Sequence, residues 1–321
     1  MSRLWSSDFR YDLAAETDSS RLYGFFEPAP QFDETRFYLA LSGGIVAYSS
    51  MTYGLYHLWY KDYPRTGFHF FNDWGEWRNM DKYGHVYSAY THTLLAYRVA
   101  RWTGLSERKS LLTGAIASTL IQSTIEVMDG FSAEWGFSIA DFAANTLGTT
   151  AFILQQSFWK EQRIQFKFSS FPYHHPNIAI GSSGSEITLR HRAEQLFGNS
   201  FMQRMMKDYN SQTYWLSFNL QSFGVKHKAV PSWLNASFGI SAGNLYGGYE
   251  NKWIENGILY DASAYQRFTR FYISPDIDFT KIKVKSPFVK SLMVLLNLTK
   301  APLPALEFNT RGEVIFHFIK F

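Results

Sequence analysis

Apolar and polar residues repeat with two different periods along the chain, and the period changes near residue 163. Before this point, four stretches have the lengths and boundary residues of helices, at residues 37–60, 82–102, 107–128 and 139–162. Ser106 stands where the third helix needs an N-cap, and Ser138 with Asp141 forms a capping-box pattern at the fourth. We therefore predict a four-helix unit over residues 36–162, preceded by an irregular lead-in over residues 1–35.

From Ile164 onwards, apolar residues alternate with polar ones, most clearly in residues 214–221, 234–241 and 271–280. A period of two is typical of antiparallel strands whose two faces differ. A short helix is predicted near residues 288–298, and a last hairpin turns at residues 309–312. The predicted fold class is α+β: the helical unit, then an antiparallel β-sheet or a partial or full β-barrel over residues 163–321.

The amino-acid composition indicates that the protein contacts a membrane. Aromatic residues make up 18% of the 321 residues and charged residues only 18%, whereas soluble domains carry about 25% charged residues. The mean hydropathy of -0.21 is too polar for a transporter with many membrane helices. Aromatic girdles and alternating strands instead suit an interfacial or β-type membrane protein. We therefore predict membrane lipid as a partner.

Two segments have features of membrane contact, and each has two interpretations. Residues 37–60 contain no Asp, Glu, Lys or Arg and are long enough to span a bilayer, but a buried or interfacial helix fits equally well. The chain ends in an aromatic segment closing at Phe321. Outer-membrane barrel proteins commonly end this way, and so do ordinary edge strands.

Charge and cysteine content exclude several classes of function. The net charge is only +4 and no basic cluster is present, so nucleic acid is not expected as a partner. The absence of cysteine removes disulfides, thiolate nucleophiles and cysteine-zinc sites, and it is compatible with an oxidising compartment. The first residues lack the apolar stretch of a secretory signal. Motifs of serine hydrolases, nucleotide-binding loops and zincins are absent as well.

The few charged residues of the predicted helices form pairs at helical spacing. These pairs are Asp81 with His85, Glu126 with Asp129, and Asp141 with Asn145. Members of a pair share one helix face, and facing helices can bring such pairs together in one site. We predict a site of Asp81, His85, Glu126, Asp129 and Asp141, supported by Lys82, Ser138 and Asn145. It would act as a carboxylate–histidine acid–base group, or bind a divalent metal of unknown identity through Asp81, His85, Glu126 and Asp129.

A structural interpretation competes with this chemistry. Asp81 fits the N-cap of a helix beginning at Lys82, and Ser138 with Asp141 fits a capping box. Capping does not explain His85 or Glu126. Glu126 lies among apolar neighbours and needs a partner, because a lone buried carboxylate is very costly. With Lys82 or His85 as that partner, the cluster would be a buried structural network.

The same residues carry a resemblance to a known family. Its pattern is D-K-x-x-H, E-x-x-D and S-x-x-D, which this chain has at residues 81–85, 126–129 and 138–141. In these motifs the chain resembles the YfiM-like family of bacterial envelope lipoproteins and secreted proteins. Residues 207–217, 233–235 and 302–308 resemble the long Bacteroidetes-type members. The resemblance implies a location in the cell envelope, in the outer membrane or periplasm, and a signal peptide that this sequence lacks.

A more distant likeness is to VanZ-like membrane proteins, which also place such residues on successive membrane helices. Asp141, Asn145 and Gly148 fit their Asp-x-x-x-Asn-x-x-Gly element. Neither resemblance implies an established reaction. The predicted function is therefore an envelope protein, associated with the outer membrane, with a structural or maintenance role built on the cluster. The alternative is a membrane-proximal hydrolase or transferase acting on a lipid or cell-wall intermediate.

Overall fold

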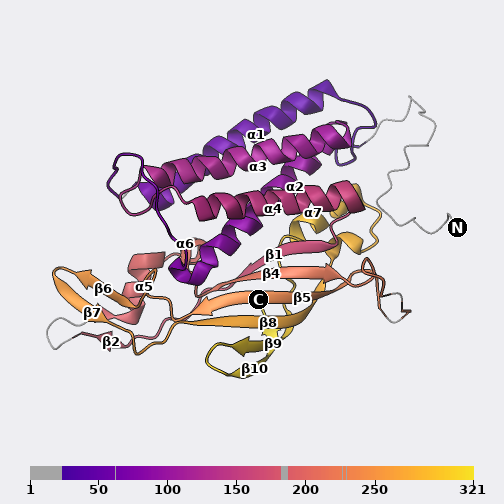
Figure 1. Cartoon of the computed structure of the whole chain (residues 1–321). Coiled ribbons are helices and arrows are strands. Elements are labelled where there is room, and N and C mark those ends of the chain that lie inside the picture. Colours follow the sequence, from indigo (N-terminus) through magenta and orange to yellow (C-terminus); the bar gives the residue numbers. More distant parts are fainter. Residues whose placement is uncertain (1–23, 62, 182–186, 226, 229) are drawn as a thin grey trace.

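The computed structural model describes residues 24–61, 63–181, 187–225, 227–228 and 230–321, and places a layer of helices against a curved antiparallel sheet (Figure 1). Most of the predicted lead-in lies outside the described residues. Helices of the first half are α1 (Glu34–Leu55), α2 (Met80–Trp102), α3 (Glu107–Gly130) and α4 (Ile139–Trp159). The helices give way to strands between Trp159 and Ile164, close to the predicted change of period. The predicted α+β class is thus confirmed.

The helix boundaries follow from side-chain caps. Asp33 Oδ1 accepts a hydrogen bond from Arg36 N at 2.9 Å, so α1 begins three residues before its predicted start. A π-helical turn (Tyr56–Tyr60) continues it to the predicted end. Ser138 Oγ accepts from Asp141 N at 3.0 Å at the start of α4, as predicted. Asp81 is not a cap, because a 3-10 turn (Glu76–Asn79) leads directly into α2 at Met80.

Along α3, the helical unit has small and polar residues inside and apolar residues outside. On α3, the buried positions recur every four residues, at Ser110, Gly114, Ser118, Gln122, Glu126 and Gly130. Leu112, Ile116 and Leu120 on the same helix are exposed. Glycine permits this packing, since a Cβ at Gly148 of α4 would lie 2.2 Å from Val86 O of α2. Backbones therefore approach closely where a soluble bundle would interdigitate leucines.

Six strands form one antiparallel sheet in the order β1-β4-β5-β8-β9-β10. These are β1 (Ile164–Ser170), β4 (Gln212–Asn219), β5 (Leu234–Gly243), β8 (Phe268–Ile277), β9 (Leu303–Asn309) and β10 (Val314–Lys320). The sheet is not closed. It is strongly curved, however, because Lys167 Nζ of β1 lies 2.8 Å from Asp276 Oδ2 of β8. Three strand spacings of about 4.8 Å would separate these strands by about 14 Å in a flat sheet.

The two faces of this sheet have the opposite character from those of a soluble sandwich. The concave face is polar and buried, and both Lys167 and Asp276 are fully inaccessible. The convex face is apolar, and the side chains of Phe238, Phe271 and Ile273 are about half exposed (51%, 47% and 49%). Cross-strand pairing makes this apolar face continuous, since Phe238 pairs with Ile273 and Ile273 with Leu306. The sequence predicted the alternation of apolar and polar residues along the strands. The structure shows in addition that the polar face of the sheet is the buried one.

Helix α2 joins the two halves. It lies between α3 and α4 on one side and the first strands of the sheet on the other (Figure 1). The ring of Tyr90 packs 4.9 Å from that of Phe166, and Tyr87 stacks on Phe168 at 5.5 Å. The part of the convex face formed by β1 is thereby covered. Helix α7 (Pro287–Leu296), close to the predicted short helix, follows β8 through a 3-10 turn (Phe279–Lys281).

A smaller unit inserted between the strands has an ordinary apolar core. It contains β2 (Ala179–Ile180), β3 (Ile187–Thr188), α5 (Leu189–Phe197), α6 (Phe201–Lys207), β6 (Lys252–Glu255) and β7 (Ile258–Asp261). Leu189, Phe197, Tyr246 and Trp253 are among the residues that bury their side chains together. The helical unit and the sheet thus bury polar groups beside apolar clusters, such as Tyr90 with Phe152 and Trp215 with Tyr272, whereas the core of the inserted unit is mainly apolar.

One described helix, α3, has the length and hydropathy of a membrane-crossing segment. Length and composition alone do not distinguish a membrane span from a core helix. The uncharged stretch at residues 37–60 does not meet the same measure.

Candidate functional site

Lys82 stands at the centre of three carboxylates. Its Nζ lies 2.6 Å from Asp73 Oδ2, 2.8 Å from Asp81 Oδ2 and 2.7 Å from Asp141 Oδ1, and its side chain is only 9% exposed. Burial lowers the pKa of Lys82, but the charges of Asp81 and Asp141 outweigh burial and raise the pKa above its usual value. The ammonium group therefore stays charged.

The second half of the cluster surrounds His85. Its Nδ1 lies 3.1 Å from Asn145 Oδ1, and because this oxygen only accepts, Nδ1 is the donor. Nδ1 is also 3.6 Å from Glu126 Oε1, and Nε2 is 3.6 Å from Asp141 Oδ1. Residues of α2, α3 and α4 thus converge, as their helical spacing predicts.

Glu126 is almost completely buried, with 1% of its side chain exposed. Oε1 accepts a hydrogen bond from Asn145 Nδ2 at 3.2 Å, and Oε2 accepts from Ser138 N at 3.4 Å. Its neighbour is therefore His85 and not Lys82, which resolves one of the alternatives left open by the sequence. Ser138 connects both halves, since its hydroxyl also donates to Asp73 Oδ1 at 2.6 Å.

Two carboxyl groups of this cluster, those of Glu126 and Asp141, have a pKa raised above neutral pH. Burial raises the pKa of Glu126 to about 8. Burial, a hydrogen bond with Asp73 and the charge of Asp81 raise the pKa of Asp141 to about 8. The pKa of Asp73 is lowered, because its hydrogen bonds with Asp141, Lys82 and Ser138 outweigh burial. Of these two carboxyl groups, Asp141 is therefore the one that holds a proton more readily, and Asp73 the one that stays charged.

Asp129 lies apart from the others. Its Oδ1 accepts a hydrogen bond from Tyr60 Oη at 2.7 Å, at the end of the π-helical turn. Burial raises its pKa to about 6. Three residues turn a helix by about 300°, so Asp129 points toward α1 while Glu126 points toward α2 and α4. The predicted set therefore converges without this member.

Two groups of side chains have the spacing of metal ligands among the described residues. They are His85 with Glu126 and Asp141, and Asp73 with Asp81 and Asp141. The predicted ligand set of Asp81, His85, Glu126 and Asp129 is divided between these groups and the Tyr60 contact. Lys82 already supplies positive charge to the second group. The first offers one imidazole and two carboxylates, a donor set that suits zinc or iron.

Three elements of the polar interior were not predicted from the sequence. Asp73 lies in the aromatic connector before α2, where no periodicity marks it, and an acid within a run of aromatic residues was the only signal. His175 Nε2 lies 2.8 Å from Asp208 Oδ2, and both are buried. Lys167 and Asp276 form the ion pair inside the sheet. The last two pairs join residues 33 and 109 positions apart, so no local pattern reveals them.

Comparison with known proteins finds a family match for part of the chain. Residues 69–157 match the model of a family described as predicted periplasmic lipoproteins (DUF2279). The matched segment includes every residue of the cluster, Asp73 among them, but spans less than a third of the chain. No curated protein and no solved structure matches the chain.

The match supports the class of protein that the motifs indicated, an envelope protein of a family without an assigned activity. The match does not test the resemblance to YfiM-like or VanZ-like proteins, or a location in the outer membrane. These finer statements remain expectations.

Proposed function

We propose that this protein is a membrane-associated component of the bacterial envelope, seated at the outer membrane, whose polar cluster holds the helical unit together. The supporting observation is the inverted distribution of polarity. Apolar side chains cover the outside of α3 and the convex face of the sheet, while Glu126 and Lys167 are buried. Soluble monomers rarely expose apolar patches larger than a few hundred Å². Lipid is the solvent in which such faces are stable.

The cluster is well suited to a structural role. Lys82 and its three carboxylates connect α2, α4 and the connector that carries Asp73, and Glu126 adds α3. Without a strong hydrophobic drive between helices in lipid, buried polar contacts supply part of the association. Breaking one contact would loosen three helices at once.

Fractionation of cells tests the membrane assignment. Inner membrane, outer membrane and periplasm are separated, and the protein is located by immunoblot. Wild type is expected in the outer membrane and to require detergent for extraction. A triple variant with serine at Phe238, Phe271 and Phe316 is expected to move to the soluble fraction. Serine at Ile254 and Leu259 of the inserted unit, which are more exposed (73% and 63%) than the three phenylalanines, should leave the distribution unchanged. Detergent-free release of wild type into the periplasm would refute the assignment.

A second function is favoured by one specific observation, the protonated carboxyl groups beside an imidazole. Glu126 and Asp141 both have a pKa of about 8, and both lie 3.6 Å from His85. A proton donor and a base in contact form the pair needed for hydrolysis or transfer. The substrate class would be a lipid or cell-wall intermediate, with a divalent metal at His85, Glu126 and Asp141 as an option.

Elemental analysis of the purified protein, together with a hydrolysis screen of lipids and peptidoglycan precursors, tests this second function. Turnover that disappears in Glu126→Gln, while the melting temperature is kept, would support it. Absence of both metal and turnover in the wild type would leave the structural role as the better proposal.

A further inference from the structure

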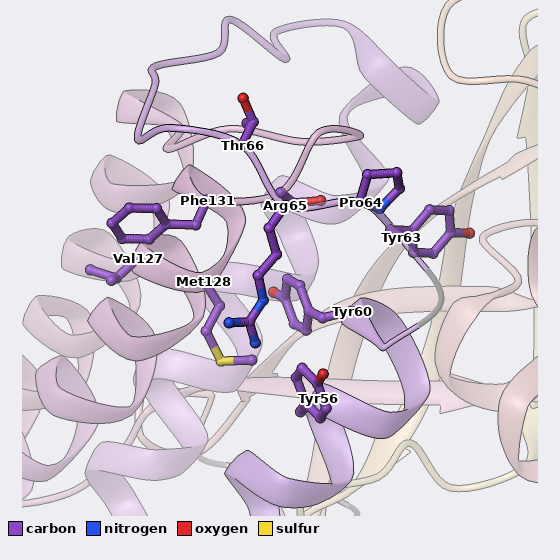
Figure 2. Close-up of a pocket in the computed structure, with 10 residues that line it drawn as sticks. Tyr56, Tyr60, Tyr63, Pro64, Arg65, Thr66, Val127, Met128 and Phe131 are labelled. Atoms are coloured by element: carbon purple, nitrogen blue, oxygen red, sulfur yellow. The ribbon is translucent and has the colours of Figure 1, made fainter.

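A cavity of ≈ 360 Å³ lies where α1, α3 and the loop after α1 meet (Figure 2). This volume falls in the range of small-molecule sites, about 300–1,000 Å³. Tyr56 and Tyr60 of the π-helical turn form one wall. Val127 and Met128 of α3, with Phe131 directly after this helix, form the other. The cavity is distinct from the Lys82 cluster.

Arg65 gives this cavity its charge. Its side chain points inward between the α3 wall and the two tyrosines (Figure 2), with Cζ 5.5 Å from the centre of the Tyr56 ring. No carboxylate among the described residues lies within ion-pair distance of its guanidinium group. A guanidinium group binds phosphate in a bidentate manner, and an aromatic ring beside it leaves that capacity free.

The walls of the cavity are fixed by hydrogen bonds before any ligand arrives. Thr66 N donates to Phe131 O at 3.0 Å, and Ala133 N donates to Pro64 O at 3.0 Å, so the loop is tied to the end of α3. Tyr60 Oη donates to Asp129 at 2.7 Å and fixes the other wall. A preformed site loses little entropy on binding.

The mouth of the cavity leads onto an apolar stripe of α3. Val127 and Phe131 are each 45% exposed, and Leu120 and Ile116 continue the same helix face with 54% and 59% exposed. The stripe is about 22 Å long at 1.5 Å per residue. It is thus longer than one leaflet of the hydrocarbon core, which is about 15 Å thick.

We propose that this cavity binds the phosphate-bearing headgroup of an anionic phospholipid, with an acyl chain along the stripe of α3. Arg65 contacts the phosphate, and the tyrosines surround the glycerol region, the level of the bilayer where Tyr is enriched. This inference rests on the membrane location proposed above. It adds a defined lipid site to a surface that otherwise contacts lipid without selection.

Native mass spectrometry of the full chain in detergent micelles tests the site. Micelles contain either phosphatidylglycerol or phosphatidylcholine, and the ratio of lipid-bound to free protein is measured. Wild type is expected to retain one phosphatidylglycerol and to prefer it to phosphatidylcholine. Arg65→Gln should lower phosphatidylglycerol binding by at least about tenfold. Arg108→Gln, which removes an exposed arginine at the other end of α3, should bind like wild type.

A variant that fills the cavity tests whether lipid binding needs the open cavity as well as the charge of Arg65. Met128→Trp keeps Arg65 and is expected to lose the bound lipid as well. Both variants should keep the melting temperature of wild type and its place in the membrane fraction, so loss of the site is distinguishable from loss of the membrane assignment. Unchanged phosphatidylglycerol binding in Arg65→Gln would overturn the proposal. So would complete displacement of the lipid by an equal concentration of inorganic phosphate, which would indicate a small-anion site.

Discussion

Replacement of Lys82 by methionine removes the charge at the centre of the cluster and keeps most of its volume. The carboxyl groups of Asp73, Asp81 and Asp141, which lay 2.6–2.8 Å from Nζ, then face one another without a cation, and only Asp141 already holds a proton at pH 7. Removing one partner of a buried ion pair costs about 3–5 kcal/mol. An independent estimate agrees, because protonating a carboxylate of ordinary pKa, about 3.9, at pH 7 costs about 4 kcal/mol. We expect Lys82→Met to lower the free energy of unfolding by about 4 kcal/mol at pH 7.

Urea unfolding in detergent, followed by tryptophan fluorescence, measures this loss. Lys160→Met is the matched control, since the Lys160 side chain is 64% exposed and its contact with Glu107 is 3.3 Å; the expected loss is below about 1 kcal/mol. The deficit of Lys82→Met should shrink by about 1.4 kcal/mol per pH unit as the pH falls toward about 4. The deficit shrinks at lower pH because the folded variant binds one proton that the unfolded chain does not bind at neutral pH, and this uptake becomes less costly as the pH falls.

Two results would refute this reasoning. One is a loss in Lys82→Met no larger than that of the Lys160 control. The other is a loss that stays constant between pH 7 and pH 4.5, which would indicate damaged packing in place of unpaired charge. Adding Asp81→Asn to Lys82→Met should recover part of the stability, and a further loss in the double variant would count against the electrostatic account.

Three further predictions concern other parts of the structure. Because the pKa of Glu126 is about 8 when folded and about 4.3 when unfolded, wild type should lose stability as the pH rises between these values, and Glu126→Gln should flatten this dependence in urea titrations. Gly148→Ala should lower the melting temperature, since overpacking costs about 1–3 kcal/mol, whereas Gly43→Ala, with open space around it, should be neutral or stabilising by up to about 1 kcal/mol. Asp276→Ala should cost about 3–5 kcal/mol by leaving Lys167 unpaired; a Tm equal to that of wild type would contradict it.

The sequence was sufficient for the type and order of most elements. Helices were predictable because uncharged stretches end at recognisable caps such as Ser138, and the main strands because their alternation is strict. The start of the second helix was misjudged, since Asp81 resembles a cap until the preceding 3-10 turn is seen. The inserted unit was not predicted, because its strands of two to four residues are too short to show a period.

For the cluster, helical spacing predicted convergence of His85, Glu126 and Asp141 and misplaced Asp129. Spacing of three or four residues defines a face only to within about 60°, which is enough for one member of a pair to point to another neighbour. Asp73 could not be predicted from spacing, because it is placed by a loop whose course depends on tertiary contacts. Which carboxyl groups hold protons also depends on burial, a property of the fold and not of the sequence.

The inverted polarity of both large parts has a common physical origin. In water, burial of apolar area drives folding and leaves charge outside; against lipid that drive vanishes, and polar contacts and close backbone packing hold the interior together. Ser118, Gly148 and the Lys82 cluster in the helices, and Lys167 with Asp276 in the sheet, make interior contacts of this second kind. The inserted unit, with Leu189 and the apolar residues around it, has an interior of the first kind. The proposed membrane contact therefore involves the helices and the sheet, and leaves the inserted unit in water.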